Sequence, residues 1–251
     1  MLRNLTEHDM LFLSSILPRA TTRAEKVILN LVAGGLMGLA TVSSAQAAGG
    51  PHVVDDAGVE TPGVCHLETW VSRHNTEGGL VNLAPACTFE SLPYIEFGAA
   101  AQRTWGPGAD TTIGPALKLN LRPLDTGIGF GVIGTAAWSV STGQAETASV
   151  ILPVSFQLHE RVRANINVGW HYLRAQPRQN QAFVGAQIEA DIARDLTLMA
   201  EAFTRDEGRP GAQIGLRWTP GRGNVDVDLL SGWRTDGATP WTITLGITVR
   251  R

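Results

Sequence analysis

The chain has 251 residues, of which 43% are hydrophobic and 17% are charged, enough to form one sizeable domain. The net charge of −3 gives no electrostatic reason to expect nucleic acid as a partner. Outside the N-terminal region there is no run of ~20 apolar residues, which argues against a helical membrane protein. The 28 glycines and 7 tryptophans instead favour an all-β protein with many turns.

The N-terminal segment has the three-part layout of a secretory signal peptide. Lys26 precedes an apolar stretch over 27–40, and a region of small residues then ends in an A-x-A site at 45–47. We expect residues 1–47 to be an N-terminal extension and signal peptide that is cleaved after Ala47. An uncleaved membrane anchor is the alternative.

Residues 48–64 are rich in Gly, Pro and Asp, and we interpret them as a short periplasmic lead-in to the folded domain. The adjacent carboxylates of Asp55 and Asp56 supply too few oxygen ligands for a good Ca²⁺ site. A turn or capping role is therefore the better interpretation for this pair.

Cys65 and Cys87 are the only cysteines of the chain. An even count in an exported protein predicts a disulfide, with two free buried thiols as the alternative. Two cysteines without histidines at ligand spacing are too few for a metal site, and we expect no metal or cofactor.

From Cys65 onward, segments with a period of two follow one another without helical periodicity, and the turns between them are short enough for antiparallel hairpins. They predict one domain over 65–251 with about twelve strands. The candidate strands are 65–74, 80–88, 93–105, 111–122, 127–138, 148–158, 162–173, 181–192, 195–205, 211–219, 224–234 and 240–250.

The alternation separates an apolar face from a polar one, as where Ile243, Leu245 and Ile247 interleave with Thr244 and Thr248. Such a pattern fits either a soluble periplasmic β-sandwich with the apolar face inside or a barrel with that face in lipid. If the first strand starts on the periplasmic side, the connections after odd-numbered strands are the longer set, as in outer-membrane barrels.

Aromatic residues gather toward the strand ends, where interfacial girdles lie in membrane barrels. A general preference of large rings for strands and barrel rims is the alternative explanation. The predicted girdle residues are Trp105, Trp138, Trp170, Tyr172, Trp233 and Trp241 near the outer ends and Trp218 near the periplasmic end.

The polar face mixes charges of both signs, which suits a wet or ion-paired lumen. Ion pairs between successive strands narrow or plug a pore of this size, and a role in selectivity is equally open. The predicted lumen-lining residues are Glu96, Lys118, Arg122, Arg163, His171, Glu189, Asp191, Glu201, Arg205, Arg217, Asp226, Asp228 and Arg234.

A family resemblance appears over residues 51–105. Its marks are the run at 55–57, the Pro62-Gly63 turn, Cys65 with Glu68 and Trp70, and the run at 85–87. This stretch resembles the outer-membrane proteins grouped as the phenol meta-degradation (MetA) pathway family. The resemblance implies a β-barrel of the outer membrane, a link to uptake of aromatic or other hydrophobic compounds, and no catalytic residues. The final strand departs from the usual barrel ending, because Val249 and Arg251 stand where terminal aromatics are read by the barrel-assembly machinery.

Few constellations suggest catalysis. Ser72 and His74 lie two residues apart and share a face, as in a membrane-embedded lipid hydrolase, but no third group orients the histidine. The chain contains no P-loop, dinucleotide fingerprint, G-x-S-x-G or H-E-x-x-H motif. We therefore expect no enzymatic activity.

Together these observations predict an antiparallel up-and-down transmembrane β-barrel of about twelve strands in the outer membrane of a Gram-negative bacterium. The expected partners are outer-membrane lipid, the barrel-assembly machinery and a small solute. Passive movement of a small solute is the leading function, and the family resemblance implies that this solute is hydrophobic or aromatic. A filled barrel with a structural or interaction role, and the lipid hydrolase, are the alternatives.

Overall fold

The computed structural model describes residues 51–74, 78–106, 108–206, 209–221, 223–235 and 239–251. The predicted N-terminal extension, signal peptide and cleavage site, and residues 48–50 of the predicted lead-in, lie outside the described residues. In the described part of the chain, no helix has the length and apolar character needed to cross a membrane.

Twelve strands follow one another, interrupted in the described residues by a single short 3-10 helix, η2 (Leu124–Thr126). The number predicted from the sequence is confirmed, and the predicted strand bounds differ from the observed ones by at most three residues. The strands are β1 (Cys65–His74), β2 (Gly79–Thr88), β3 (Ile95–Trp105), β4 (Thr111–Arg122), β5 (Ile128–Ser139), β6 (Ala145–His159), β7 (Val162–Leu173), β8 (Asn180–Ala193), β9 (Leu196–Arg205), β10 (Gly211–Trp218), β11 (Val225–Trp233) and β12 (Thr242–Arg250).

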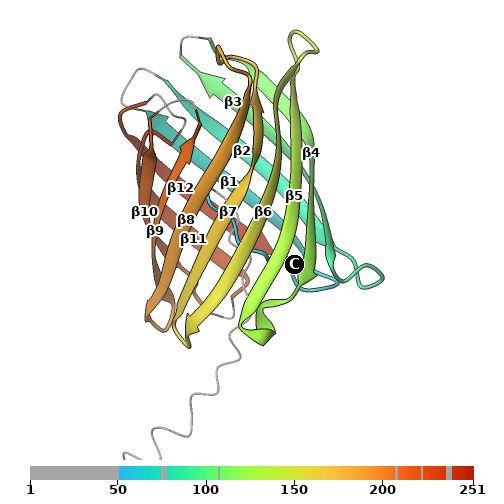
Figure 1. The fold of residues 1–251 in the computed structure, drawn as a ribbon, viewed down its shortest axis with the longest axis vertical. Helices are drawn as coiled ribbons and strands as arrows, with labels where there is room; N and C mark the ends of the chain where they lie inside the picture. The colour runs from blue at the N-terminus through green and yellow to red at the C-terminus, as the bar shows by residue number, and fades with distance from the viewer. Residues whose placement is uncertain (1–50, 75–77, 107, 207–208, 222, 236–238) are drawn as a thin grey trace, which may run out of the picture. The chain divides into compact units, whose positions relative to one another are not determined.

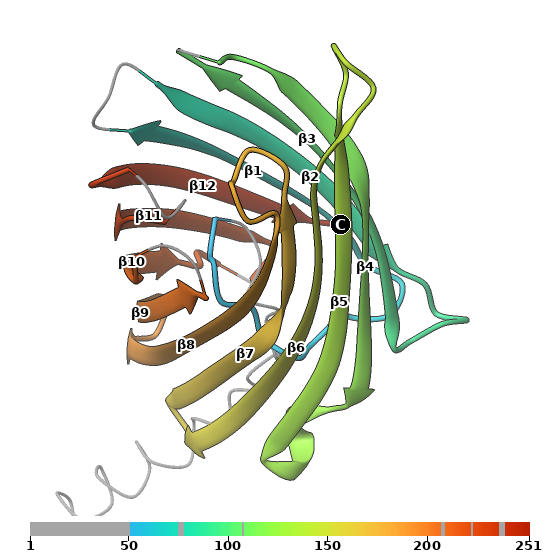
Figure 2. The same cartoon turned by 45° about the horizontal axis from the view of Figure 1, so that its top comes forward.

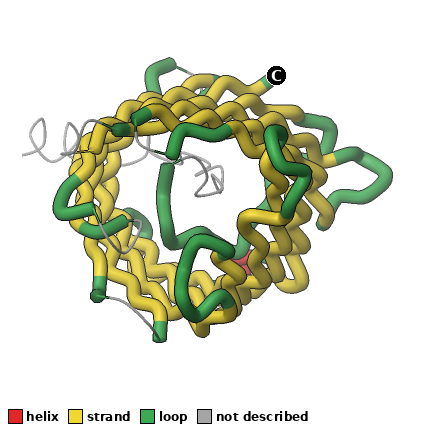
Figure 3. Tube along the Cα trace, turned by 90° about the horizontal axis from the view of Figure 1, so that it is seen from above, coloured by secondary structure: helices red, strands yellow, loops and turns green. Residues whose placement is uncertain are grey.

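Each strand pairs antiparallel with its sequence neighbours, and β12 pairs with β1, so the sheet closes into a barrel (Figures 1 and 3). The closing ladder runs from His66 opposite Arg250 to His74 opposite Thr242. It is extended by two backbone hydrogen bonds of 2.9 and 2.8 Å between Cys65 and Arg251. Closure removes the free strand edges on which an open sheet would aggregate.

The polar face points inward and the apolar face outward. On β12, Thr242, Thr244 and Thr248 are buried, whereas Leu245 is 52% exposed and Ile243 is 49% exposed. The same division holds around the ring: among the described residues, 32 large hydrophobic side chains are exposed, most of them on outward positions. This is the reverse of a soluble β-sandwich, so that alternative is wrong.

The disulfide predicted between Cys65 and Cys87 is present, and the two residues are directly opposite each other on β1 and β2. We call this end of the barrel the disulfide end and the opposite end the loop end. Odd-numbered strands run from the disulfide end to the loop end, and even-numbered strands return.

Candidate channel lumen and its internal segment

Residues 51–60, which we call the internal segment, lie inside the ring of strands (Figures 2 and 3). Val54 and Ala57 are 0% and 1% exposed, although they belong to no strand or helix. The structure therefore corrects the expected periplasmic lead-in: this part of it occupies the barrel interior. Its mixture of polar and apolar residues fits the barrel interior, because its partners there are polar groups of the wall and one small apolar cluster.

The beginning of the internal segment is held by Glu201 on β9 and Gln213 on β10. The Glu201 carboxylate accepts hydrogen bonds from the backbone N–H groups of Val53 (3.2 Å) and Val54 (2.8 Å). Gln213 donates to the same carboxylate (2.7 Å) and to the carbonyl oxygen of Pro51 (3.1 Å). One buried charge is thus solvated by protein donors instead of water.

His52 lies between two acidic side chains of the wall. Its Nδ1 is 3.8 Å from Glu201 Oε1 and its Nε2 is 3.9 Å from Asp228 Oδ1. Arg217 Nε reaches Asp228 at 2.8 Å and Asp226 at 4.0 Å, so cationic and anionic groups alternate across β9, β10 and β11. The imidazole ring of His52 therefore lies between a carboxylate of β9 and a carboxylate of β11.

Val54 anchors the internal segment by apolar packing. Its side chain joins a buried cluster inside an otherwise polar lumen, and Gly185 on β8 provides the space for it. A Cβ at Gly185 would lie 2.7 Å from Val54 Cγ2, which is closer than side chains approach one another. The other cluster members are Ile133, Ile151, Phe183 and Phe203.

Asp55 and Asp56 bind the wall through charge. Lys118 Nζ on β4 donates to Asp55 Oδ1 at 2.8 Å and to Asp56 Oδ1 at 3.0 Å. Arg163 on β7 is 3.5 Å from Asp56 Oδ2 and pairs with Glu189 at 2.7 Å. Lys118 therefore binds both aspartates, and Arg163, from a different strand, also binds Asp56.

The turn after these aspartates is also fixed. Asn167 accepts from the Asp55 backbone N–H at 2.8 Å and donates to its carbonyl at 2.7 Å. Asp56 Oδ1 accepts from the Gly58 N–H at 3.0 Å, the local turn interaction expected of this residue type. The sequence interpretation as a turn residue was correct for Asp56, but it missed the attachment to the wall.

The end of the internal segment returns to the closing strands. Ala57 N–H donates to Ser155 Oγ at 2.9 Å, and Glu60 N–H donates to Glu96 Oε2 at 2.8 Å. Arg250 Nε then donates to Glu60 Oε2 at 2.7 Å. The internal segment therefore contacts wall residues from β3 to β12 before the chain enters β1.

Most of the predicted lumen residues face the interior. His171 and Arg205 lie farther toward the loop end, where His171 stacks on Phe183 at 4.7 Å and the Arg205 guanidinium lies 5.7 Å from the same ring. The residues that the structure places on the inner face are Glu96, Lys118, Arg163, His171, Glu189, Glu201, Arg205, Arg217, Asp226 and Asp228.

Arg122, Asp191 and Arg234 lie at strand ends. A register shift just before Arg122 places it opposite the outward Phe130, and its exposed side chain bonds the hydroxyl of Thr126. Asp191 stays in register with Thr197, which pairs with the inward Arg217, so it keeps the predicted face but is exposed at the disulfide end of β8. Arg234 follows β11 with a φ of 54°, and its guanidinium lies 4.2 Å from the Trp233 ring centroid. That ring is on the outward face, so Arg234 does not line the lumen.

The predicted girdle residues lie near strand ends and outward. Trp105 differs from the exposed tryptophans because its ring covers Gly79, at the position where a Cβ would stand. Tyr172 is likewise only partly exposed. The outward tryptophans with 40–53% exposure are Trp138, Trp170, Trp218, Trp233 and Trp241.

Trp70 was missed as an interior residue. It pairs with Asn82 and Gly246, both on the inner face, and therefore faces the lumen. Its spacing of two from Glu68 and from Ser72 was the available signal, because residues two apart share a face.

Ser72 and His74 do not form a nucleophile–base pair in the structure. The Ser72 hydroxyl is buried and shares a 2.7 Å hydrogen bond with the hydroxyl of Thr244 on β12. Within the described residues, no group of three or more His, Cys, Asp or Glu side chains is arranged to hold a metal ion.

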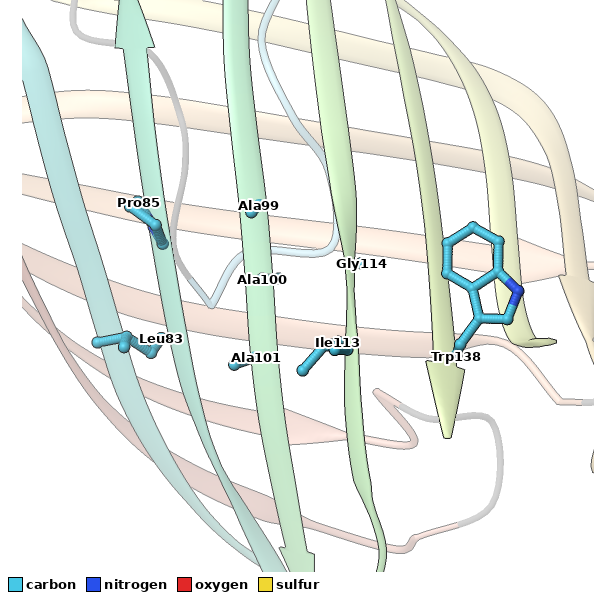
Figure 4. Close-up of a pocket in the computed structure, with 8 residues that line it drawn as sticks. All are labelled: Leu83, Pro85, Ala99, Ala100, Ala101, Ile113, Gly114 and Trp138. Carbon is cyan, nitrogen blue, oxygen red and sulfur yellow. The ribbon is translucent and has the colours of Figure 1, made fainter. Parts of the chain in front are cut away.

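On the outer surface, the wall from β2 to β5 carries an apolar hollow of about 650 Å³. Figure 4 shows that its floor is made of small residues, with Ala99 and Ala101 on β3 between Pro85 on one side and Trp138 on the other. Few side-chain atoms therefore cover the outer face of the wall here.

Fold and lumen together define a class: a closed antiparallel barrel of twelve strands with a polar interior, an apolar exterior and the fold of porins. The chain belongs to the family described as "Uncharacterised conserved protein UCP029691", whose model matches residues 36–251. The match does not extend to the phenol meta-degradation pathway family, so that resemblance stays a prediction.

No curated protein matches the sequence. Among solved structures, the chain is similar to the KdgM porin, with a TM-score of 0.59 and 8% identity over 73% of this chain and 98% of that chain. A structure of KdgM porin in complex with disordered oligogalacturonate is similar with a TM-score of 0.58 and 8% identity, over 73% of this chain and 98% of that chain. The NanC porin is similar with a TM-score of 0.56 and 7% identity, over 74% of this chain and 98% of that chain. At these identities the similarity concerns the fold.

Proposed function

We propose that this protein is an outer-membrane channel through which small polar solutes diffuse passively, and that the internal segment sets the width of the passage. The apolar exterior supports the membrane location, because a surface that faces hydrocarbon must be free of charged and unsatisfied hydrogen-bonding groups. The porin fold of the similar structures supports the channel.

The observation that carries the proposal is the way in which the lumen binds residues 51–60. The wall holds them through backbone hydrogen bonds, ion pairs and one apolar contact, at Glu201, Lys118 and Gly185 respectively. A lumen with such a wall is wetted by water wherever the internal segment does not fill it. The width and the electrostatic character of the remaining passage depend on the pairing between wall and internal segment.

The polar interior favours polar solutes over the hydrophobic or aromatic ones that the family resemblance implies. An apolar molecule gains nothing by leaving hydrocarbon for a lumen lined by amide, hydroxyl and charged groups. Movement down a concentration gradient needs no cofactor, and the wall residues act by excluding solutes of unsuitable size and charge.

Conductance in planar bilayers tests the channel. We expect a small conductance for the wild type and a larger one for Gly185→Leu, because the added side chain would occupy the place of Val54 and displace the internal segment. Gly134→Leu is the matched control, since a Cβ at Gly134 has nothing within 4 Å. A heat-dependent shift in gel mobility should show that all three barrels are folded.

A second candidate is a filled barrel with a structural or interaction role, favoured by the near-complete burial of Val54, Asp56 and Ala57. If wild type and Gly185→Leu both show the mobility shift but neither conducts, the filled barrel is the better function. Recovery of the wild type in the soluble periplasmic fraction would contradict both candidates.

A further inference from the structure

The inner wall is not uniform around the barrel. Where β7 and β8 face the internal segment, several inward side chains are large, polar and buried, among them Asn165, Asn167, Gln187 and Glu189. Across β2 to β6, two inward rows differ from this pattern. They contain only glycine, alanine, serine and threonine.

The first row is continuous through five strands. Its members pair in register, from Ala86 to Gly98 to Ala116 to Thr135 to Ser149. The hydroxyls of Thr135 and Ser149 share a hydrogen bond of 2.7 Å, which places both on the inner face together. Since the wall strands are tilted, a row of this kind runs diagonally across the lumen surface.

The second row lies next to the first on the loop-end side. Ala100 pairs with Gly114, and Ala137 pairs with Thr147. Neither row contains a charged residue. We call the nine residues of the two rows the small-residue wall.

The small-residue wall reaches water, whereas the opposite wall does not. Thr135 and Thr147 are exposed although they point into the barrel, and Ala100 and Ala116 are partly exposed. Side chains of a hydrogen atom, a methyl or a hydroxymethyl group take little space, so these strands leave more of the lumen open than larger side chains would. The loop between β3 and β4 is also linked to the loop between β5 and β6, because Ser141 Oγ donates a hydrogen bond to Asp110 Oδ1 at 2.9 Å. Hydrogen bonds from Ser139 and Ser141 hold the pKa of Asp110 below its usual range.

Resting on the proposed channel function, we infer that solutes move along the small-residue wall and that this path selects neutral hydroxylated molecules over ions. The wall offers hydroxyl groups and no charge to exchange for the hydration shell of an ion. Three basic residues of the inner face are committed elsewhere: Lys118, Arg163 and Arg217 each lie within 3 Å of a carboxylate.

Swelling of proteoliposomes in glucose or in gluconate tests this inference. The two probes have nearly the same size, and only gluconate carries a charge. We expect faster influx of glucose than of gluconate through the wild type. Ala116→Lys should raise gluconate influx relative to glucose, because it adds a cation to the path.

Tryptophan substitutions at inward and outward positions of the same wall test where the path lies. Ala100→Trp and Ala116→Trp should each reduce glucose influx at least about fivefold, because the indole would fill the lumen beside the wall. Ala99→Trp should leave influx unchanged, because Ala99 faces outward into the apolar hollow of Figure 4, which has room for the ring. The mobility shift on heating shows whether each variant has folded.

Two outcomes would overturn the inference alone: unchanged glucose influx in folded Ala100→Trp and Ala116→Trp, or gluconate influx equal to that of glucose. Absence of influx of both probes through wild type and Gly185→Leu would instead remove the proposed channel, and the inference with it.

Discussion

At the scale of single residues, Lys118 binds the internal segment through two ion pairs. Its ammonium group binds both Asp55 and Asp56, and its side chain is 8% exposed. Replacing it with methionine keeps the side-chain length but leaves two carboxylates without their shared partner. Breaking a buried ion pair from one side costs about 3–5 kcal/mol.

We therefore expect Lys118→Met to release the internal segment. The release is measured as labelling of a Val54→Cys variant by a water-soluble maleimide, since both native cysteines are in the disulfide. Labelling should be slow while Lys118 is present because Val54 is 0% exposed, and about 100-fold faster or more with Lys118→Met.

Arg103→Met provides the control for loss of a positive charge, because Arg103 is exposed and bonds Thr111 at 2.9 Å, away from the internal segment. Equal labelling rates with and without the Lys118→Met substitution would contradict the anchoring role of this ion pair.

At the scale of elements, alternation fails where a strand ends irregularly. Arg122 was assigned to the lumen by counting in twos, but the ladder shifts register just before it and pairs it with Phe130. One bulged residue changes the face of everything after it. A single sequence gives no sign of such a shift, whereas the regular run of Ile243, Leu245 and Ile247 shows its face directly.

The disulfide links two neighbouring strands, and we expect the hydrogen bonding between these strands to persist without it. It joins β1 and β2, which already pair over nine residues, and β1 also pairs with β12 over nine. Cys65→Ser combined with Cys87→Ser should therefore still close into a barrel. For a separation of 22 residues, the loss is about 3 kcal/mol in a chain-entropy account.

The measurement is the temperature at which the gel mobility shifts. It should fall in the double serine variant, and wild type under reducing conditions should behave in the same way as the variant. Complete loss of the shifted form would mean that closure of β1 depends on the covalent link.

At the scale of the whole molecule, the apolar outside should be measurable as a preference for lipid. Leu245 lies in the middle of β12, pairs with Leu229 and Val71, and is 52% exposed. Arginine there would stand in hydrocarbon at mid-depth. In vesicles we expect Leu245→Arg to lower the free energy of unfolding by about 2–4 kcal/mol.

Val249→Arg, on the same face near the end of β12, should cost about 0–1 kcal/mol because it lies close to the interface. Equal costs at the two positions in equilibrium unfolding would argue that depth in a bilayer plays no part, and that the outer face meets a uniform environment.

The sequence predicts the barrel well because its information is local. Period two, short turns and two cysteines at neighbouring strand ends are all readable within a few residues of each other. The position of the internal segment is different. Its Gly, Pro and Asp content resembles a linker, and its partners, such as Glu201 and Arg250, are far away in the chain. Nothing within residues 51–60 specifies which wall they will meet.

The same separation determines the order of assembly. The bond between Glu60 and Arg250 spans 190 residues, and those from Glu201 to Val53 and Val54 span 148 and 147. Contacts so distant along the chain form late, because the intervening loop must first lose its entropy. Arg250 lies on the last strand, so the ribosome makes residues 51–60 well before their final partner exists. The part of the domain that is synthesised first is consequently the last to dock, and its burial marks a barrel that has already closed.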